Sequence, residues 1–361
     1  MHVSPHNRLS LALLFFVLQV APFLHPLFGA KDEASVAPQL LQSPWEARWV
    51  THPNEPGQEF GVFHFRRSFP LNAVPESFVI HVSADPRYRL FVNGESVSVG
   101  PAAGDQSNWR FETVDIAAQL RVGENTLAAT VWNFAQHRAL AHHSYHSAFI
   151  VQGASEREAI VNTRAGAWRV TKDAAYLPIP VSHEDVDGYF AASPGERFEA
   201  AKHPWGWQEI GFDDSDWEPV GELFPGTPTG TNPYGNLYGW SLVPREIPPM
   251  EESLTRLAEI RRSEGFAPDP GFLSGERALD IPAHTRATLL LDQSVLTNAY
   301  PSLIVSGGRN ATLKITYAES LRDDQNRKGN RNEIEGKHIL GLHDLFILDG
   351  GERRTLQTLW L

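Results

Sequence analysis

The sequence contains no cysteine. This excludes disulfide bonds, thiolate zinc sites, iron–sulfur clusters and a cysteine nucleophile. Basic residues are also fewer than acidic ones. The 361 residues include 31 Lys and Arg and 43 Asp and Glu, which gives a net charge of −12. A nucleic-acid or anionic-membrane partner is therefore disfavoured, since a phosphate-binding surface needs clustered Lys and Arg. With 42% hydrophobic and 20% charged residues, the composition is that of a globular protein, and the length suggests about two domains.

An apolar run lies close to the N-terminus, where Arg8 precedes Leu9 to Val20. The run is too short to span a bilayer, and a small pair, Gly29-Ala30, comes before the polar residues that follow. This pattern predicts a secretory signal peptide over residues 1–30, with an uncleaved anchor or tether as the alternative. No later segment has 18 consecutive apolar residues. We therefore expect a periplasmic or extracellular protein without a transmembrane segment after the signal peptide.

Short strands are predicted throughout the body of the chain. Residues 78–83 and 87–92 alternate with period 2, and Asn93-Gly94 follows at once. Because Asn-Gly accepts the two positive φ angles of a type I′ turn, we predict a hairpin over 87–99. Further strand-like segments are 127–132, 149–151, 167–170, 289–291, 303–305 and 312–317. Short strands with turn signals between them predict an all-β fold built from β-sandwiches.

A proline-rich stretch, residues 243–250, predicts a domain boundary. We place a first domain at residues 44–245 and a second β-sandwich at residues 251–361, so that two sandwiches follow in tandem. Residues 251–262 are ambiguous between a weak helical stripe and a linker strand. The apolar pattern of residues 355–361 stops inside a strand, which would leave an unpaired edge. We therefore expect the sequence to be truncated and the second domain to be incomplete at its C-terminus.

Four histidines lie close together at His137, His142, His143 and His146. His142 and His146 would share a face of a helix, as metal ligands can. However, the segment leads into a strand, and nothing nearby supplies an obvious carboxylate partner. We expect no metal site here, and interpret the segment as a solvated loop or as a loop that lines a cleft or interface.

The spacing of Asp324, Asn326, Gly329 and Glu335 matches that of a calcium-binding loop. Lys328, however, occupies a ligand position, and flanking helices are not evident. We therefore interpret the match as a coincidence.

The same segment, Asp323 to Glu335, is a long polar hairpin rich in Asn and Arg. Such a loop suits contact with another domain or with a sugar. Arg331 offers a planar fork to a carboxylate or to sugar hydroxyls, and Asn332 stands beside it.

The remaining candidates give weaker signals. Tryptophans can stack on sugars, and we keep Trp109, together with His142 and His146, as a candidate for sugar or interdomain contact, although most tryptophans are expected in cores. The acidic clusters at 184–187, 213–216 and 323–324 lie in polar turns, where exposure to solvent is expected to give no raised pKa of the kind that a glycosidase acid needs. We name no catalytic residue and expect no cofactor.

Several strings resemble those of known glycoside hydrolases. Residues 88–94 (Tyr-Arg-Leu-Phe-Val-Asn-Gly), 114–127 and 212–217 (Phe-Asp-Asp-Ser-Asp-Trp) resemble jelly-roll modules of large glycoside hydrolases. Residues 316–321 (Thr-Tyr-Ala-Glu-Ser-Leu), 328–333, 343–346 (His-Asp-Leu-Phe) and 358–360 (Thr-Leu-Trp) resemble bacterial α-L-rhamnosidases. The likeness runs from about Trp45 to Leu361.

The resemblance implies a galactose-binding-like jelly roll followed by a concanavalin-like sandwich, both non-catalytic. In that family an (α/α)₆ barrel holds the catalytic acid and base, and this sequence has no matching segment. The resemblance thus implies the N-terminal portion of a secreted enzyme that hydrolyses terminal α-L-rhamnosyl linkages by inversion. The alternatives are a free-standing carbohydrate-binding or adhesion module, and an exo-glycosidase for a different sugar.

Overall fold

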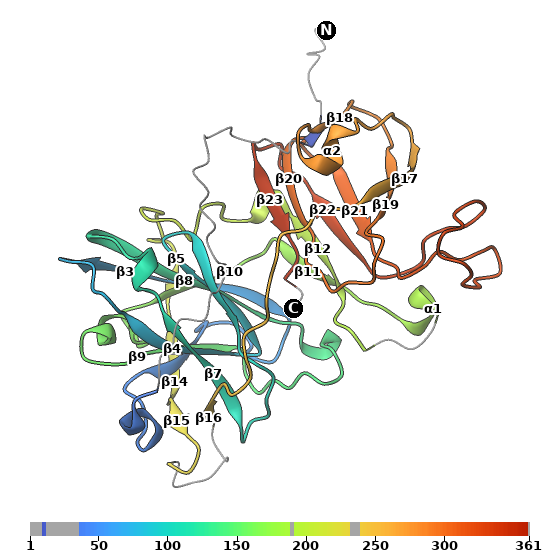
Figure 1. Cartoon of the computed structure of the whole chain (residues 1–361). Helices are drawn as coiled ribbons and strands as arrows, with labels where there is room; N and C mark the ends of the chain where they lie inside the picture. The colour runs from blue at the N-terminus through green and yellow to red at the C-terminus, as the bar shows by residue number, and fades with distance from the viewer. Residues whose placement is uncertain (1–8, 12–35, 188–190, 232–238, 360–361) are drawn as a thin grey trace. The chain divides into compact units, whose positions relative to one another are not determined.

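The computed structural model describes residues 9–11, 36–187, 191–231 and 239–359 (Figure 1). Apart from Leu9–Leu11, which form strand β1, the predicted signal peptide lies outside these residues. No helix within the described ranges is long and apolar enough to cross a membrane.

The chain divides into two compact units, and neither is continuous in sequence. The first unit comprises Phe28–Ala174 and Pro204–Met250, and the second comprises Met1–Leu27, Ala175–His203 and Glu251–Leu361. The predicted ranges 44–245 and 251–361 differ from this division in residues 175–203. The physical reason is strand pairing, because β12 (Gly195–Glu199) runs parallel to β22 (His343–Ile347) and hydrogen-bonds to it.

The first unit contains two large sheets. The six-stranded sheet has the order β13 (Glu218–Pro219), β10 (Arg169–Lys172), β3 (Gly61–Leu71), β8 (Gly123–Asn133), β5 (Arg87–Val92) and β6 (Glu95–Gly100). The seven-stranded sheet has the order β14 (Gly221–Pro225), β2 (Arg48–Thr51), β9 (Ala148–Gly153), β4 (Val79–Asp85), β7 (Trp109–Asp115), β16 (Ser241–Pro244) and β15 (Thr227–Pro228). Short 3₁₀ turns at Pro38–Leu41, Ala117–Gln119, Ala135–His137 and Glu158–Val161 connect the strands.

The core of the first unit lies between these two sheets. Strand β5 buries every second residue, so that Tyr88, Leu90 and Val92 face inward. They belong to one buried cluster with Ile80 of β4 and Phe149 of β9, which come from the opposite sheet. This is the packing of a β-sandwich and confirms the predicted fold class.

The predicted hairpin is also present. Strands β5 and β6 pair antiparallel, and the turn between them has φ of 52° at Asn93 and 89° at Gly94. The amide of Asn93 bonds to the Gln119 carbonyl and to Asn125, which fixes the turn against the neighbouring strand.

The outer faces of both sheets carry further tryptophans. On the seven-stranded sheet, Trp45, Trp49, Trp109 and Trp240 are buried in a second cluster. On the six-stranded sheet, Trp207 and Trp217 pack against Ala128 of β8. Trp49 and Trp109 belong to strands β2 and β7 of the seven-stranded sheet, whereas Trp45, Trp207, Trp217 and Trp240 lie in the connecting segments and cover sheet faces that would otherwise meet water.

The second unit consists of three smaller sheets. Their orders are β18 (Leu279–Ile281), β1, β20 (Ser302–Gly307), β23 (Arg354–Gln357); β11 (Tyr176–Ile179), β12, β22, β21 (Thr312–Thr316); and the pair β17 (Glu259–Glu264), β19 (Thr288–Asp292). Helices α1 (His183–Val186) and α2 (Gly271–Ser274) have four residues each, and Ala200–Lys202 forms a 3₁₀ turn. Of the ambiguous residues 251–262, the part from Glu259 onward is strand β17, and 251–258 form no regular element.

Candidate functional site

A buried carboxylate organises the loops at one end of the first unit. Asp85, the last residue of β4, is fully buried. Its Oδ2 accepts hydrogen bonds from the backbone N–H groups of Tyr145 (2.7 Å) and His146 (3.1 Å) and from the Trp240 indole (2.8 Å). Burial raises the pKa of Asp85 to about 6, although these donors act in the opposite direction. Asp85 thus ties the histidine-rich loop to the segment that enters β16.

The two predicted histidines lie in this loop, and neither is helical. His146 is half-buried, its Nε2 lies 3.3 Å from the Thr51 hydroxyl, and a side chain at Gly57 would collide with its ring. His142 is also half-buried, and burial, followed by the charges of Arg87 and Arg138, lowers its pKa. Burial likewise lowers the pKa of His146. Both rings are therefore held neutral near pH 7, in a loop rather than on a helical face.

Trp109 has a different environment from these histidines. It is the first residue of β7, 4% of it is exposed, and its indole donates to the Ala84 carbonyl at 3.0 Å. Its ring packs edge-on against Trp240. A ring in this position supports the core of the first unit and has no open face for a sugar.

The Phe-Asp-Asp-Ser-Asp-Trp string is built around a buried arginine. Arg66 of β3 pairs with Asp214 at 2.6 Å and donates to the carbonyls of Trp207 and Glu209. Its guanidinium carbon also lies 5.8 Å from the ring centre of Phe212. The string therefore closes over one face of the six-stranded sheet, and Asp214 serves as the counter-ion of Arg66.

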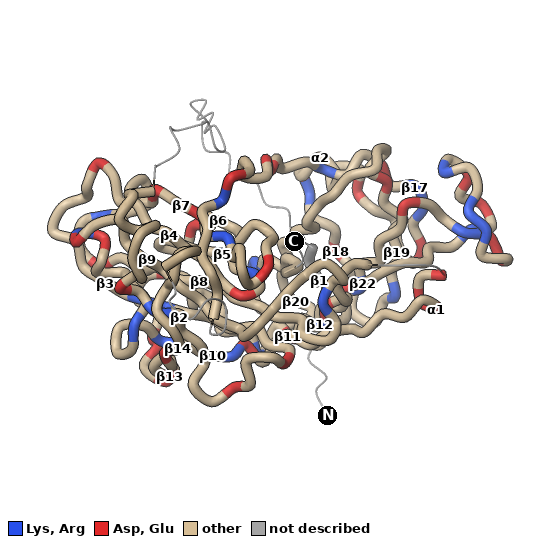
Figure 2. The backbone as a smooth tube through the Cα atoms, turned by 90° about the horizontal axis from the view of Figure 1, so that it is seen from below, with Lys and Arg blue, Asp and Glu red and all other residues tan. Residues whose placement is uncertain are grey.

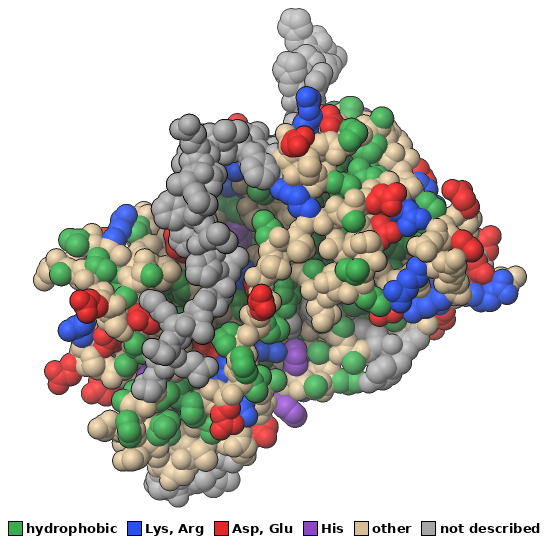
Figure 3. All heavy atoms as spheres, in the orientation of Figure 1, with side chains coloured by type: hydrophobic (Ala, Val, Ile, Leu, Met, Phe, Trp, Pro, Cys, Tyr) green, Lys and Arg blue, Asp and Glu red, His purple; other side chains and the backbone are tan. Residues whose placement is uncertain are grey.

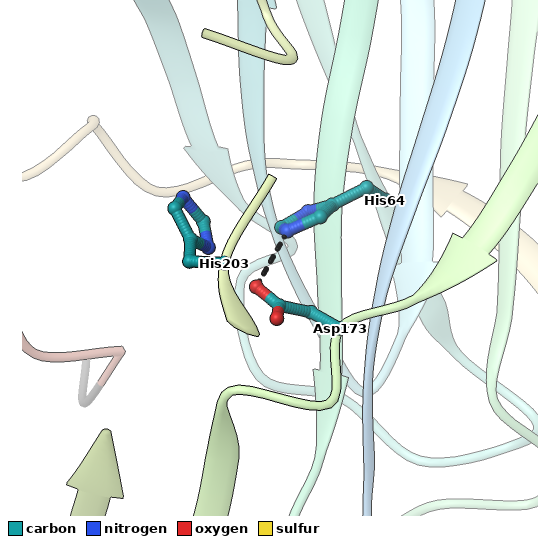
Figure 4. A group of neighbouring side chains, drawn as sticks. All are labelled: His64, Asp173 and His203. Atoms are coloured by element: carbon teal, nitrogen blue, oxygen red, sulfur yellow. Dashed lines mark hydrogen bonds and ion pairs between the residues drawn. The ribbon is translucent and has the colours of Figure 1, made fainter. Parts of the chain in front are cut away.

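A second buried polar pair joins His64 of the same strand to Asp173, which directly follows β10 (Figure 4). His64 Nε2 is 2.9 Å from Asp173 Oδ2, and both side chains are almost fully buried. The Trp207 ring stacks on the His64 ring with centroids 3.9 Å apart. Figure 4 also labels His203, which belongs to the second unit, where its ring contacts Phe198.

In the second unit, three of the family-like strings meet through hydrogen bonds. The Tyr317 hydroxyl donates to Asp344 Oδ2 at 2.6 Å, and Asp344 Oδ1 accepts from the backbone N–H of Glu196 at 2.7 Å. The Glu196 carboxylate in turn accepts from the Leu359 N–H at 2.8 Å. Burial raises the pKa of Asp344, and burial followed by the Asp344 charge raises that of Tyr317. The network fastens the 358–360 string to β12 and β22.

The predicted polar hairpin projects from the second unit. Arg331 and Asn332 are both exposed, as are Asp324 and Glu335. Two isolated bridges, from Arg322 to residues 328 and 338, close the base of the loop. The structure thus brings Arg331 and Asn332 together, whereas His142, His146 and Trp109 belong to the first unit.

Sequence reasoning did not single out Asp85, Arg66, His64, Glu196 or Asp344 as organising residues. For Asp344 and Arg66 a signal existed, because each lies in a family-like string or bonds to one. Asp85 and Glu196 bond to partners that are distant in sequence. Glu196 and Leu359, for example, are separated by 163 positions. Only the fold identifies such pairs.

Residues 74–233 match the family model of the α-L-rhamnosidase N-terminal domain. The chain is similar to a GH78-family rhamnosidase of Bacillus sp. GL1, with 28% identity and a TM-score of 0.51, over 61% of this chain and 22% of that chain. It is also similar to the α-L-rhamnosidase from Aspergillus terreus, with 16% identity and a TM-score of 0.53, over 86% of this chain and 32% of that chain.

The second likeness concerns the fold alone, and no curated protein matches the chain. The matched chain spans less than a third of either solved enzyme. The family match includes the strings at 88–94, 114–127 and 212–217, which resemble jelly-roll modules of glycoside hydrolases, whereas the rhamnosidase-like strings at 316–321, 328–333, 343–346 and 358–360 lie outside it. Residues 74–233 are therefore similar to the N-terminal domain of α-L-rhamnosidases, and the chain as a whole is similar to part of these enzymes.

Proposed function

We propose that this chain is the non-catalytic N-terminal portion of an exported glycoside hydrolase that removes terminal α-L-rhamnosyl residues. The observation that carries the proposal is the match of residues 74–233 to the rhamnosidase N-terminal domain, joined to a similarity that covers only 22% of the Bacillus enzyme. We further propose that the first unit is a galactose-binding-like jelly roll and that the second is a concanavalin-like sandwich. The apolar run at residues 9–20 supports export to the periplasm or the medium.

The environments of the perturbed carboxyl groups support a non-catalytic role. A glycosidase acid or base must reach the scissile bond, and one of the pair needs a raised pKa. Asp85, Glu112 and Asp344 have raised pKa values, but all three are buried and accept hydrogen bonds from the surrounding fold. Their chemistry is that of structural anchors.

The test is hydrolysis of an aryl α-L-rhamnoside. The purified chain is expected to show no turnover, whereas the product of a longer reading frame that continues beyond Leu361 is expected to hydrolyse the substrate. A stop codon directly after Leu361 would contradict the proposal and favour a free-standing carbohydrate-binding module. Turnover by the chain that is lost on mutation of Asp213 or Asp324, to asparagine in each case, would contradict the non-catalytic role.

A further inference from the structure

An apolar surface is left uncovered at one end of the β17–β19 pair. The Ala258 N–H donates to the Asp292 carbonyl, so that residues 251–257 and 293–299 leave the pair at the same end. These two segments carry Leu254, Leu257, Val295 and Leu296, which are 89%, 40%, 65% and 57% exposed. Several exposed aliphatic side chains on adjoining segments are typical of a protein-contact surface.

The polar hairpin is held beside this end by two neighbouring arginines. Successive side chains of a regular strand point to opposite faces, but the register of β17 shifts between Ile260 and Arg262. Because of this irregularity, Arg261 donates to the Asn332 carbonyl at 2.9 Å, and Arg262 donates to the Ile334 and Lys337 carbonyls at 3.4 Å. Both arginines therefore hold the same loop.

These contacts use main-chain atoms of the loop. The Lys337 ammonium also donates to the Asn330 carbonyl, at 3.1 Å. These hydrogen bonds thus fix the backbone of the loop, while the side chains of Arg331 and Asn332 stay exposed. A loop ordered before it meets a partner loses less conformational entropy on binding.

Arg261 links loop 323–337 to the end of β19, from which the apolar segment 293–299 leaves. Its second terminal nitrogen pairs with Asp292 at 2.7 Å, at the point where β19 ends. We call this the ribbon-end face and define it as Leu254, Leu257, Val295, Leu296 and loop 323–337. Figure 2 shows the mixed basic and acidic residues along the loop beyond β17, and Figure 3 shows the charged side chains gathered in the same region.

We propose that the ribbon-end face is the surface on which the catalytic domain of the longer protein packs. This rests on the proposed function. Its exposed apolar residues are aliphatic, which suits burial against a protein, whereas sugars stack on aromatic rings. About two thirds or more of each solved rhamnosidase lies outside the similarity. A longer protein of this kind has a large further part that can pack on this face. Arg331 and Asn332 supply hydrogen bonds at the rim of the contact.

The absence of cysteine from the chain makes a direct test simple. Val295→Cys introduces a thiol on the ribbon-end face, and Val122→Cys is the matched control, because the two valines are 65% and 64% exposed and Val122 belongs to the first unit. Maleimide labelling is followed by peptide mass spectrometry in the 361-residue chain and in the longer protein. In the longer protein, labelling at position 295 is expected to slow at least about tenfold, while labelling at position 122 stays unchanged.

Equal labelling at position 295 in both proteins would overturn the docking face. Slower labelling of the 361-residue chain at rising protein concentration would also overturn it, since the occupant would then be a second copy. Rhamnosidase activity of the unlabelled longer protein is measured on the same preparation. If activity is present and position 295 reacts freely, only the docking face fails. If no longer reading frame exists, or if its product is inactive, the proposed function itself fails.

Discussion

Acid should destabilise the first unit through one buried histidine, His81. This residue of β4 is fully buried, its Nδ1 lies 3.0 Å from the Thr113 hydroxyl, and its ring is flanked by Trp45 and Phe111. Its Nε2 has no hydrogen-bond partner within the described residues. Burial therefore lowers the pKa of His81 from 6.5 to about 4.

The sign and size of the effect follow from linkage. The unfolded chain takes up a proton at His81 near pH 6.5, whereas the folded chain does so only near pH 4. The stability that this group contributes is complete above pH 6.5 and is lost as the pH falls to 4. At 1.36 kcal/mol for each pKa unit, the loss is about 3 kcal/mol by pH 4.

The assay is urea unfolding followed by tryptophan fluorescence between pH 4 and pH 7, on the wild type and on His81→Phe. Other titrating groups are common to both proteins and cancel in the difference. The variant should lose about 3 kcal/mol less stability than the wild type over this range. His81→Leu serves as a second variant in case phenylalanine overfills the site. If both variants show the wild-type pH dependence, the unprotonated buried state of His81 is refuted.

Three further changes test the anchors described above. Arg66→Met should destabilise the first unit by about 3–5 kcal/mol in denaturant titrations, because Asp214 and two carbonyls lose their donor, and a loss under about 1 kcal/mol would contradict this. Tyr317→Phe should lower the free energy of unfolding by about 1–3 kcal/mol, and by more at pH 7 than at pH 4, because the hydroxyl stabilises the charged form of Asp344. A loss of stability that is independent of pH would contradict this role of the hydroxyl. Gly94→Ala should lower stability by about 1–3 kcal/mol, measured as a fall in Tm, because φ is +89° there, and an unchanged Tm would show that the turn relaxes.

The sequence by itself determined the features that depend on neighbours along the chain. Period-2 alternation gives the buried residues of β5, because side chains of a strand alternate between faces whatever lies beyond it. Asn93-Gly94 gives the hairpin, because the φ angles of a type I′ turn are a local preference. The family-like strings led to the rhamnosidase N-terminal domain, which the match over residues 74–233 confirms.

The tertiary structure decided which distant groups meet. The parallel pairing of β12 with β22 assigns residues 175–203 to the second unit, and no local pattern encodes the partner of a strand. The sequence could not assign Trp109, because an indole gives the same pattern whether it is buried in a core or stacks on a ligand. The structure shows that Trp109 is buried. The anchoring roles of Asp85, Arg66 and Glu196 arise from burial beside partners far along the chain, since a carboxylate or guanidinium acquires its chemistry from the groups and the solvent around it.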